Sequence, residues 1–188
     1  MKRLFVGFEL SEEAREKVVA VQDRLREVAT RQGVRFVRHE KIHLTLVFLG
    51  QQAEDSIEAI ERTVSDVCAR HRPLNLTLQH LGGFPGLVRP KVLWCGVEGE
   101  VQELQSLQND LATALGPFAE PEAKAYAPHL TLARISPGSK EVGRLAGQIA
   151  LELGTGEIVR WNPDHCTLFE STPDGRYEVL NRWPLRTD

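Results

Sequence analysis

The tetrapeptide HLTL occurs twice in the 188-residue chain, at residues 43–46 and 129–132. Each copy follows the same arrangement of local patterns: an alternating apolar segment, then apolar residues at three-and-four spacing, then HLTL. The alternating segments are LFVGFEL at 4–10 and VLWCGVE at 92–98. Alternation is typical of a strand, and three-and-four spacing is typical of an amphipathic helix. The sequence therefore predicts a strand–helix–strand unit that occurs twice, in two lobes related by a pseudo-twofold axis.

The remaining patterns alternate between the same two types of element. We predict helices from Ser11 towards Gly33 and over 57–67, 101–115 and 142–149. Further strands are predicted at 34–37, 42–49, 74–81, 129–133, 157–161, 165–171 and 177–183. The Gly- and Pro-rich segment 82–90 is predicted to be a loop. Because no linker or low-complexity segment interrupts the chain, residues 1–188 are expected to form a single two-lobed domain.

The repeated tetrapeptide also predicts chemistry. Side chains alternate between the faces of a strand, so His43 and Thr45 would point one way while the intervening leucines are buried. The same holds for His129 and Thr131. If the lobes face each other, two imidazoles and two hydroxyls converge. Arg134 adds a cation whose guanidinium can bind a phosphate in a bidentate way.

Such a set suits phosphodiester chemistry. Histidine can act as acid or base because its pKa lies near neutral pH, and threonine hydroxyls can donate to phosphate oxygens. One H-x-T pair is weak evidence, but two identical copies at matching positions favour a catalytic role. This chemistry requires neither a metal nor another cofactor.

One alternative overlaps the first motif. Residues 39–43 read HEKIH, which fits the zinc-hydrolase pattern H-E-x-x-H. That pattern needs a helix that places His39 and His43 on one face. The flanking residues favour a strand, because they are rich in β-branched and aromatic side chains at period two. The zinc hydrolase is therefore the less favoured interpretation, and no metal site is predicted.

Several segments resemble the two-histidine phosphoesterases, and within them the RNA 2′,3′-cyclic phosphodiesterases, also called 2′-5′ RNA ligases. These segments are RLFVGFEL, KIHLTLVFLG, GGFPGLVRPKVLWCGV, APHLTLAR and RYEVLNRWPL. The resemblance implies a bilobal α+β fold, with two antiparallel sheets and flanking helices around a central cleft. It also implies hydrolysis of an RNA-terminal or nucleoside 2′,3′-cyclic phosphate to a 2′-phosphomonoester. It further implies His43 as the general acid, His129 as the general base, and 2′-5′ RNA ligation as a side activity.

Two further interpretations concern aromatic and histidine side chains. Phe84 could stack on a base, as aromatic residues do with single-stranded RNA, or it could plug the core beneath a Gly-rich turn. The three tryptophans, in strand patterns, are expected in the core. A third H-x-T, at His165 and Thr167, lacks the preceding strand–helix unit, so we expect a satisfied or surface histidine there.

Composition limits the partners and the compartment. The net charge of −3 argues against a broad basic face for duplex DNA, and the N-terminus is neither a signal peptide nor a membrane span. Three widely spaced cysteines suggest buried thiols in a reducing compartment, so we expect a cytoplasmic monomer. The expected partner is an RNA end or a cyclic nucleotide. A binding module without turnover, or an enzyme for another small cyclic phosphate or RNA end, stays open.

Overall fold

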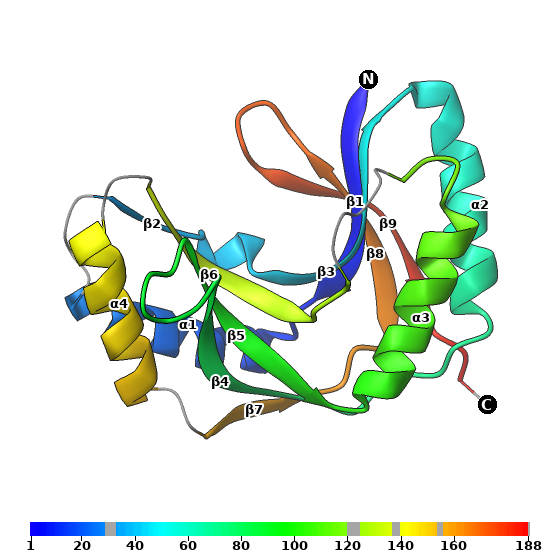
Figure 1. Cartoon of the computed structure of the whole chain (residues 1–188). Coiled ribbons are helices and arrows are strands. Elements are labelled where there is room, and N and C mark those ends of the chain that lie inside the picture. Colours follow the sequence, from blue (N-terminus) through cyan, green and yellow to red (C-terminus); the bar gives the residue numbers. More distant parts are fainter. Residues whose placement is uncertain (29–32, 120–124, 137–139, 154–155, 188) are drawn as a thin grey trace.

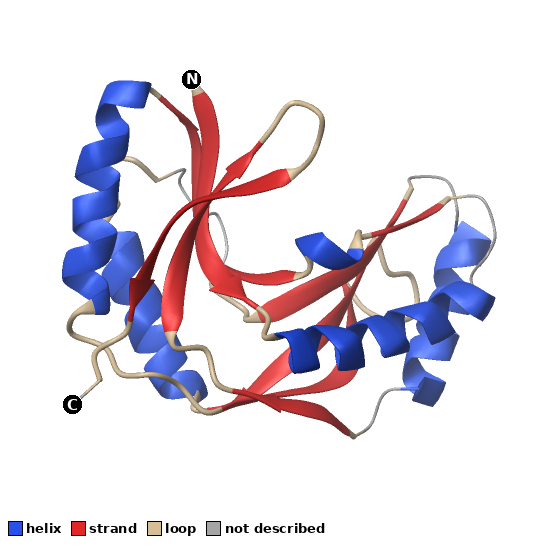
Figure 2. Ribbon diagram, turned by 180° about the vertical axis from the view of Figure 1, so that it is seen from behind, coloured by secondary structure: helices blue, strands red, loops and turns tan. Residues whose placement is uncertain are grey.

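Two antiparallel β-sheets, each covered on one face by helices, make up the architecture (Figures 1 and 2). The computed structural model describes residues 1–28, 33–119, 125–136, 140–153 and 156–187. Sheet A has the strand order β3 (His43–Gln52), β1 (Lys2–Glu9), β8 (His165–Ser171) and β9 (Tyr177–Pro184). Sheet B has the order β2 (Val34–Phe36), β6 (His129–Ile135), β5 (Val92–Gly99), β4 (Leu76–Phe84) and β7 (Glu157–Trp161). The predicted α+β class with two antiparallel sheets is confirmed.

The helices of the two repeated units are exchanged between the sheets. Helix α1 (Glu12–Val28) follows β1 of sheet A but packs against β7 of sheet B and against α4 (Lys140–Leu153). Helix α3 (Val101–Ala114) follows β5 of sheet B but packs against β3 of sheet A and against α2 (Ile57–Cys68). In Figure 1, α2 and α3 therefore lie together beside sheet A, while α1 and α4 lie together beside sheet B. The strand orders β3-β1-β8-β9 and β6-β5-β4-β7 correspond, and the predicted repeated units supply β1 and β3 of the first and β5 and β6 of the second.

The predicted loop at 82–90 is partly strand. Strand β4 continues to Phe84, and Gly82 pairs with Trp94 of β5. A Cβ atom added at Gly82 would lie 2.2 Å from the Trp94 ring. Glycine at this position allows the indole to lie close against β4, so here it marks a close approach and not a turn. The prediction that the strand ends at residue 81 was therefore wrong.

The core lies between each sheet and its helices. The leucines of both HLTL segments are buried there, as predicted (Leu44, Leu46, Leu130 and Leu132). Cys68, Cys95 and Cys166 are buried free thiols. The predicted end of the first helix before Gly33 falls partly on residues 29–32, outside the described residues. Within the described ranges, no helix is long and apolar enough to cross a membrane.

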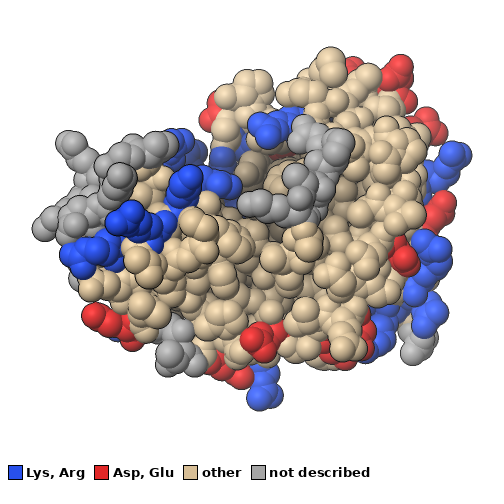
Figure 3. All heavy atoms as spheres, viewed as in Figure 1, with Lys and Arg blue, Asp and Glu red and all other residues tan. Residues whose placement is uncertain are grey.

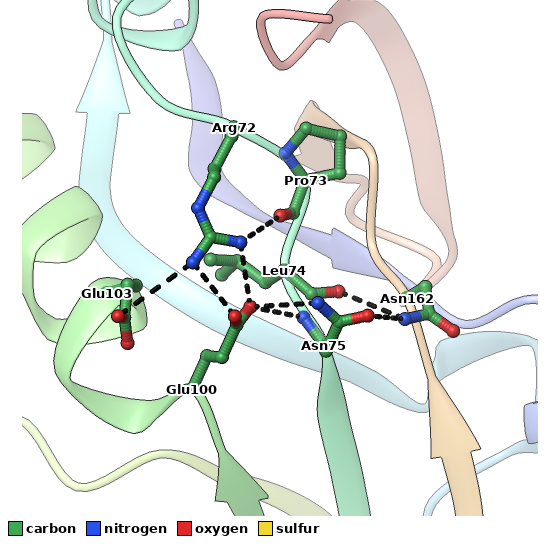
Figure 4. Close-up of polar contacts among 7 residues, drawn as sticks. All are labelled: Arg72, Pro73, Leu74, Asn75, Glu100, Glu103 and Asn162. Carbon is green, nitrogen blue, oxygen red and sulfur yellow. Dashed lines mark hydrogen bonds and ion pairs between the residues drawn. The ribbon is translucent and has the colours of Figure 1, made fainter.

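A polar network fastens the connections between the sheets (Figure 4). Glu100, at the start of α3, accepts hydrogen bonds from the Arg72 guanidinium at 2.8 and 3.1 Å and from the backbone N–H of Asn75 at 2.7 Å. The Asn162 amide donates to the Asn75 side chain at 2.7 Å. These residues belong to the α2–β4, β5–α3 and β7–β8 connections. The network thus joins three chain crossings near the ends of the strands.

Candidate active site

His43 is the first residue of strand β3. The HEKIH segment contains only a single 3-10 turn, over His39–Lys41, and the chain is extended from Ile42 onward. The His39 ring points to Asp23 of α1, with 3.6 Å between Nε2 and the carboxylate. A helix carrying His39 and His43 on one face is therefore not formed, and the strand prediction for His43 is confirmed.

The two H-x-T pairs occupy corresponding places on the two sheets. His129 and Thr131 begin β6, as His43 and Thr45 begin β3. The Tyr126 hydroxyl, just before β6, donates to the Thr45 carbonyl at 3.1 Å, which joins the starts of the two strands. Nearby His129 contributes to lowering the pKa of His43, because two adjacent positive charges would repel. The fold thus brings together the pairs that the repeat predicts. We call the sheet face that carries each pair its inner face.

Both imidazoles are held by the same backbone contact. His43 Nδ1 lies 2.7 Å from the Lys41 carbonyl, and His129 Nδ1 lies 2.7 Å from the Ala127 carbonyl. A carbonyl can only accept, so Nδ1 carries the proton in each ring. In the neutral rings, Nε2 is therefore the basic atom. On His43, Nε2 lies 2.8 Å from the Thr45 hydroxyl, which can donate to it.

The two histidines differ in electrostatic environment. Burial lowers the pKa of His43 from the ordinary 6.5 to about 4, and nearby His129 and Arg15 add to the shift. Burial also lowers the pKa of His129, with a further contribution from Arg134. Both rings are therefore neutral in the free protein at pH 7, and His43 holds its neutral form down to lower pH. The two H-x-T motifs are identical, but their histidines titrate at different pH values.

A β-bulge places Arg134 on the inner face. Strict alternation from His129 would put Arg134 among the buried leucines, on the outer face. In the structure, Thr131 pairs with Trp94 and Ala133 pairs with Leu93, so Leu132 is an extra residue. Leu132 and Ala133 are then buried in succession, and Arg134 returns to the side of His129. The effect of Arg134 on the pKa of His129 agrees with this placement.

The same bulge occurs on β3. Thr45 pairs with Gly7 and Val47 pairs with Val6, which leaves Leu46 as the extra residue. The inner-face position that corresponds to Arg134 is Phe48, whose side chain is 46% exposed. The two halves thus present a guanidinium on sheet B and a phenyl ring on sheet A. This difference breaks the symmetry of the site.

Two buried glutamines support the bulges. Gln22 of α1 donates from Nε2 to the Leu132 carbonyl at 2.9 Å and to the Val37 carbonyl at 2.8 Å. Gln108 of α3 donates from Nε2 to the Leu46 carbonyl at 3.3 Å. Each exchanged helix therefore supplies one donor to the bulge of the sheet that it covers. Because unpaired buried carbonyls are costly, these amides help to fix the strand geometry that aims the inner-face side chains.

Neither glutamine was predicted as part of the site, although the sequence contains a signal for both. Gln22 lies four residues after Val18 and three before Leu25, within an apolar helix stripe. Gln108 has the same spacing to Leu104 and Leu111. A polar residue inside a buried stripe indicates a specific hydrogen-bonding partner. What the pattern could not reveal was the identity of that partner.

Aromatic rings surround each histidine. The Phe84 ring meets His129 edge-on at 5.0 Å between centroids, and Trp94 lies 6.3 Å from the same ring. Phe84 is 37% exposed, so the core-plug interpretation was wrong. Trp94 is half-buried beside the site and not a core residue, unlike the fully packed Trp161. Around His43 lie three rings, at centroid distances of 4.8, 5.7 and 5.3 Å, from Phe5, Phe169 and Tyr177.

The third H-x-T lies in a different environment. His165 contacts Asp164 at 2.5 Å and lies 3.6 Å from Glu9, while the Thr167 hydroxyl donates to Glu9 at 3.0 Å. With Arg182, which pairs with Glu9, His165 lines a surface pocket of about 280 Å³. This imidazole has acidic partners, in agreement with the expectation of a satisfied histidine.

Comparison with known proteins shows which family the chain resembles. Residues 10–173 match the family model described as the 2′-5′ RNA ligase superfamily. An Archaeoglobus fulgidus protein named RNA 2′,3′-cyclic phosphodiesterase is 32% identical over 150 residues, which cover 80% of this chain and 82% of the relative. A Methanothermobacter thermautotrophicus protein of the same name is 30% identical over 99% of this chain and 95% of the relative.

Solved structures agree with the sequence comparison. E. coli LigT in complex with 3′-AMP is similar with a TM-score of 0.73 and 25% identity, over 99% of each chain. A Thermus thermophilus protein has a TM-score of 0.74 and 25% identity, again over 99% of each chain. The likeness therefore extends over both sheets and the exchanged helices.

Proposed function

The chain belongs to the 2′-5′ RNA ligase superfamily, and from this premise we propose that it hydrolyses RNA-terminal and nucleoside 2′,3′-cyclic phosphates to 2′-phosphomonoesters. The observation that carries the proposal is the meeting of two H-x-T pairs, each at the start of a bulged strand. A backbone carbonyl holds Nδ1 of each ring, which leaves Nε2 as the atom for proton transfer, and on His43 this atom is hydrogen-bonded to the Thr45 hydroxyl. A relative that only bound a nucleotide would have no need of two such imidazoles. The names of the relatives support the same reaction.

The reaction needs two proton transfers. A base takes a proton from water as its oxygen attacks phosphorus, and an acid gives a proton to O3′ as the P–O3′ bond breaks. The products are a 3′-hydroxyl and a 2′-phosphomonoester. Thr45 and Thr131 would donate to the non-bridging oxygens, and Arg134 would balance their charge. These groups replace the role that a metal ion plays in many phosphodiesterases, so we propose that the reaction is metal-independent.

The roles of the two histidines follow one of two assignments. The family resemblance gives His43 as the acid and His129 as the base. For His43 to carry a proton, the bound phosphate must raise a pKa that lies near 4 in the free protein. The opposite assignment matches the order in the free protein, where His43 is the stronger candidate for the neutral base. We propose the first assignment, and a change of leaving group tests it.

Phe84 is the proposed contact for a base. Its exposed ring lies against His129, so a nucleoside whose phosphate sits between the histidines can reach it. Stacking of this kind is tolerant of base identity, because every base offers a π-face. If the attacking water is replaced by an RNA 5′-hydroxyl, the same groups would form a 2′-5′ linkage, which we propose as a side activity.

The deciding experiment is hydrolysis of an RNA oligonucleotide ending in a 2′,3′-cyclic phosphate, in excess EDTA, with the position of the product phosphate identified. We expect a 2′-phosphate. His43→Ala and His129→Ala should each lower kcat by about 10²–10⁴-fold or more, which is the usual contribution of one acid or base. His165→Ala is the matched control, since it removes the histidine of an H-x-T outside the site.

Other outcomes would redirect the assignment. Binding of the RNA end without turnover would indicate a binding module. Turnover that requires added zinc would contradict the metal-independent mechanism. Near-normal kcat in either active-site variant would rule out paired acid–base catalysis.

A further inference from the structure

Two arginines lie side by side on the inner face of sheet B. Arg35 of β2 is the direct cross-strand partner of Arg134 of β6. Directly opposite residues in an antiparallel pair project to the same face, so the Arg35 side chain points to the side of His129. The flanking residues agree, because Phe36 faces α1, where the Arg26 guanidinium lies 5.0 Å from its ring. Arg35 therefore belongs to the same surface as the proposed active site.

This pair is unfavourable in the free protein. Both side chains are exposed, and neither has a hydrogen bond or ion pair with any residue that the structure describes. Like charges directly opposite each other on adjacent strands destabilise a sheet. Figure 3 shows Lys and Arg side chains gathered along the sheet B side of the hollow between the sheets, over β2. The chain as a whole carries a net charge of −3, so this local excess of positive charge runs against its composition.

The charge exceeds what one cyclic phosphate can balance. A cyclic phosphodiester bears a single negative charge, and Arg134 together with a protonated histidine already supplies two positive charges. A second guanidinium beside Arg134 would leave the excess larger still. An RNA end, in contrast, carries another phosphate on the 5′ side of its terminal nucleoside. A phosphate there would turn the repulsion between the arginines into two charge-assisted contacts.

We propose that Arg35 forms a second phosphate subsite, which takes the internucleotide phosphate on the 5′ side of the terminal cyclic phosphate. This inference rests on the proposed function and names its substrate class. The site then favours RNA ends over free cyclic mononucleotides. Arg134 serves the terminal phosphate, and Arg35 serves the one before it.

The test compares three substrates that differ in one phosphate or one nucleoside. They are adenosine 2′,3′-cyclic phosphate, its 5′-phosphorylated form, and the dinucleotide ApA ending in a 2′,3′-cyclic phosphate. We expect the wild-type protein to prefer the two substrates with a second phosphate by about tenfold in kcat/KM, a typical value for one charged contact. Arg35→Gln should abolish this preference and leave the mononucleotide within about twofold of wild type.

Salt dependence gives a second readout. Loss of one phosphate contact to a single strand should reduce the slope of log KM against log salt by about 0.7 for the dinucleotide. Arg160→Gln is the matched control, because Arg160 is an exposed arginine on β7, the opposite edge strand of sheet B. In phosphate-free buffer, Arg35→Gln should unfold at the same temperature as wild type or higher, since it removes a like-charge contact.

The outcomes separate this inference from the proposed function. If Arg35→Gln slows the mononucleotide as much as the dinucleotide, Arg35 acts on the reacting phosphate and the second subsite is refuted. An effect no larger than that of Arg160→Gln also overturns it. If the wild-type protein turns over none of the substrates, the proposed function fails. The subsite is then tested by the dissociation constants of the wild-type protein and Arg35→Gln for adenosine 2′-phosphate and ApA 2′-phosphate. A loss of affinity confined to the dinucleotide supports it, and an equal loss for both refutes it.

Discussion

At the scale of single residues, burial sets how the two histidines titrate. Each Nδ1 donates to the carbonyl two residues earlier, so both rings present Nε2 to the site. Burial lowers the pKa of both, and that of His43 falls to about 4. Catalysis by an acid–base pair requires one neutral and one protonated ring. The pair holds one proton between the pKa of His129 and that of His43, and the pH dependence of kcat/KM is the same whichever ring carries that proton in the complex.

The pH profile of kcat/KM follows from this order. We expect a bell-shaped curve with its maximum between about 4 and the ordinary value of 6.5. As the pH falls from neutral, activity should rise while the pair of rings gains its first proton, and it should fall near pH 4 as the pair gains its second and no neutral base is left. Steady-state kinetics on a cyclic mononucleotide measures the curve, and His165→Ala should leave its shape unchanged. A maximum above neutral pH would show that the rings titrate outside this window.

The leaving group distinguishes the acid from the base. A substrate with sulfur at the 3′ position expels a thiolate, which needs no proton from an acid. The variant that lacks the acid should therefore regain much of its lost activity on this substrate, by about 10²-fold or more, while the variant that lacks the base should not. Rescue of His43→Ala supports the assignment of His43 as the acid. Rescue of His129→Ala in its place would reverse the two roles.

At the scale of elements, two bulged strands and two exchanged helices build the inner faces. The bulge at Leu132 turns Arg134 back to the side of His129, and the bulge at Leu46 turns Phe48 to the side of His43. A buried glutamine donates to the carbonyl of each bulged leucine. Since each glutamine comes from the helix of the other repeated unit, neither half can complete its site alone.

Removal of the Gln22 amide tests this connection. Gln22→Met keeps the side-chain length but leaves the Val37 and Leu132 carbonyls without that donor. We expect a loss of about 1–3 kcal/mol in the free energy of unfolding, measured by urea denaturation. KM for a cyclic phosphate should rise as well, because Arg134 is no longer held in place. Gln102→Met, on the exposed side of α3, is the control, and equal behaviour of the two variants would contradict a role for Gln22.

At the scale of the whole molecule, the two sheets must keep a fixed relation for the histidines to meet. The network of Arg72, Asn75, Glu100 and Asn162 joins three of the connections between them (Figure 4). The hydrogen bond from Arg72 lowers the pKa of Glu100 to about 2, with Asn75 adding to the shift. The folded-state pKa lies below the unfolded one, so this carboxylate stabilises the fold at neutral pH, and its contribution disappears as the pH falls towards 2.

Glu100→Gln should therefore lower the unfolding temperature at pH 7 by a few degrees at most, since the network is exposed to solvent. The difference from wild type should shrink as the pH is lowered towards 2, which differential scanning calorimetry can follow. Glu103→Gln is the control, because Glu103 lies 3.9 Å from Arg72 and makes no hydrogen bond to it. An undiminished difference at low pH would show that the Glu100 charge is not the cause.

The sequence by itself determined the two repeated units, the strands that carry His43 and His129, and the burial of the intervening leucines. Alternation and helical periodicity are local properties, so they can be recognised in the amino-acid sequence. Only the tertiary structure decided that Arg134 faces the site, that Phe84 and Trp94 lie beside His129, and that Arg35 is the neighbour of Arg134. A bulge shifts the alternation by one residue, and cross-strand register pairs residues far apart in the chain. Neither effect leaves a local pattern in the sequence, so both had to be seen in the fold.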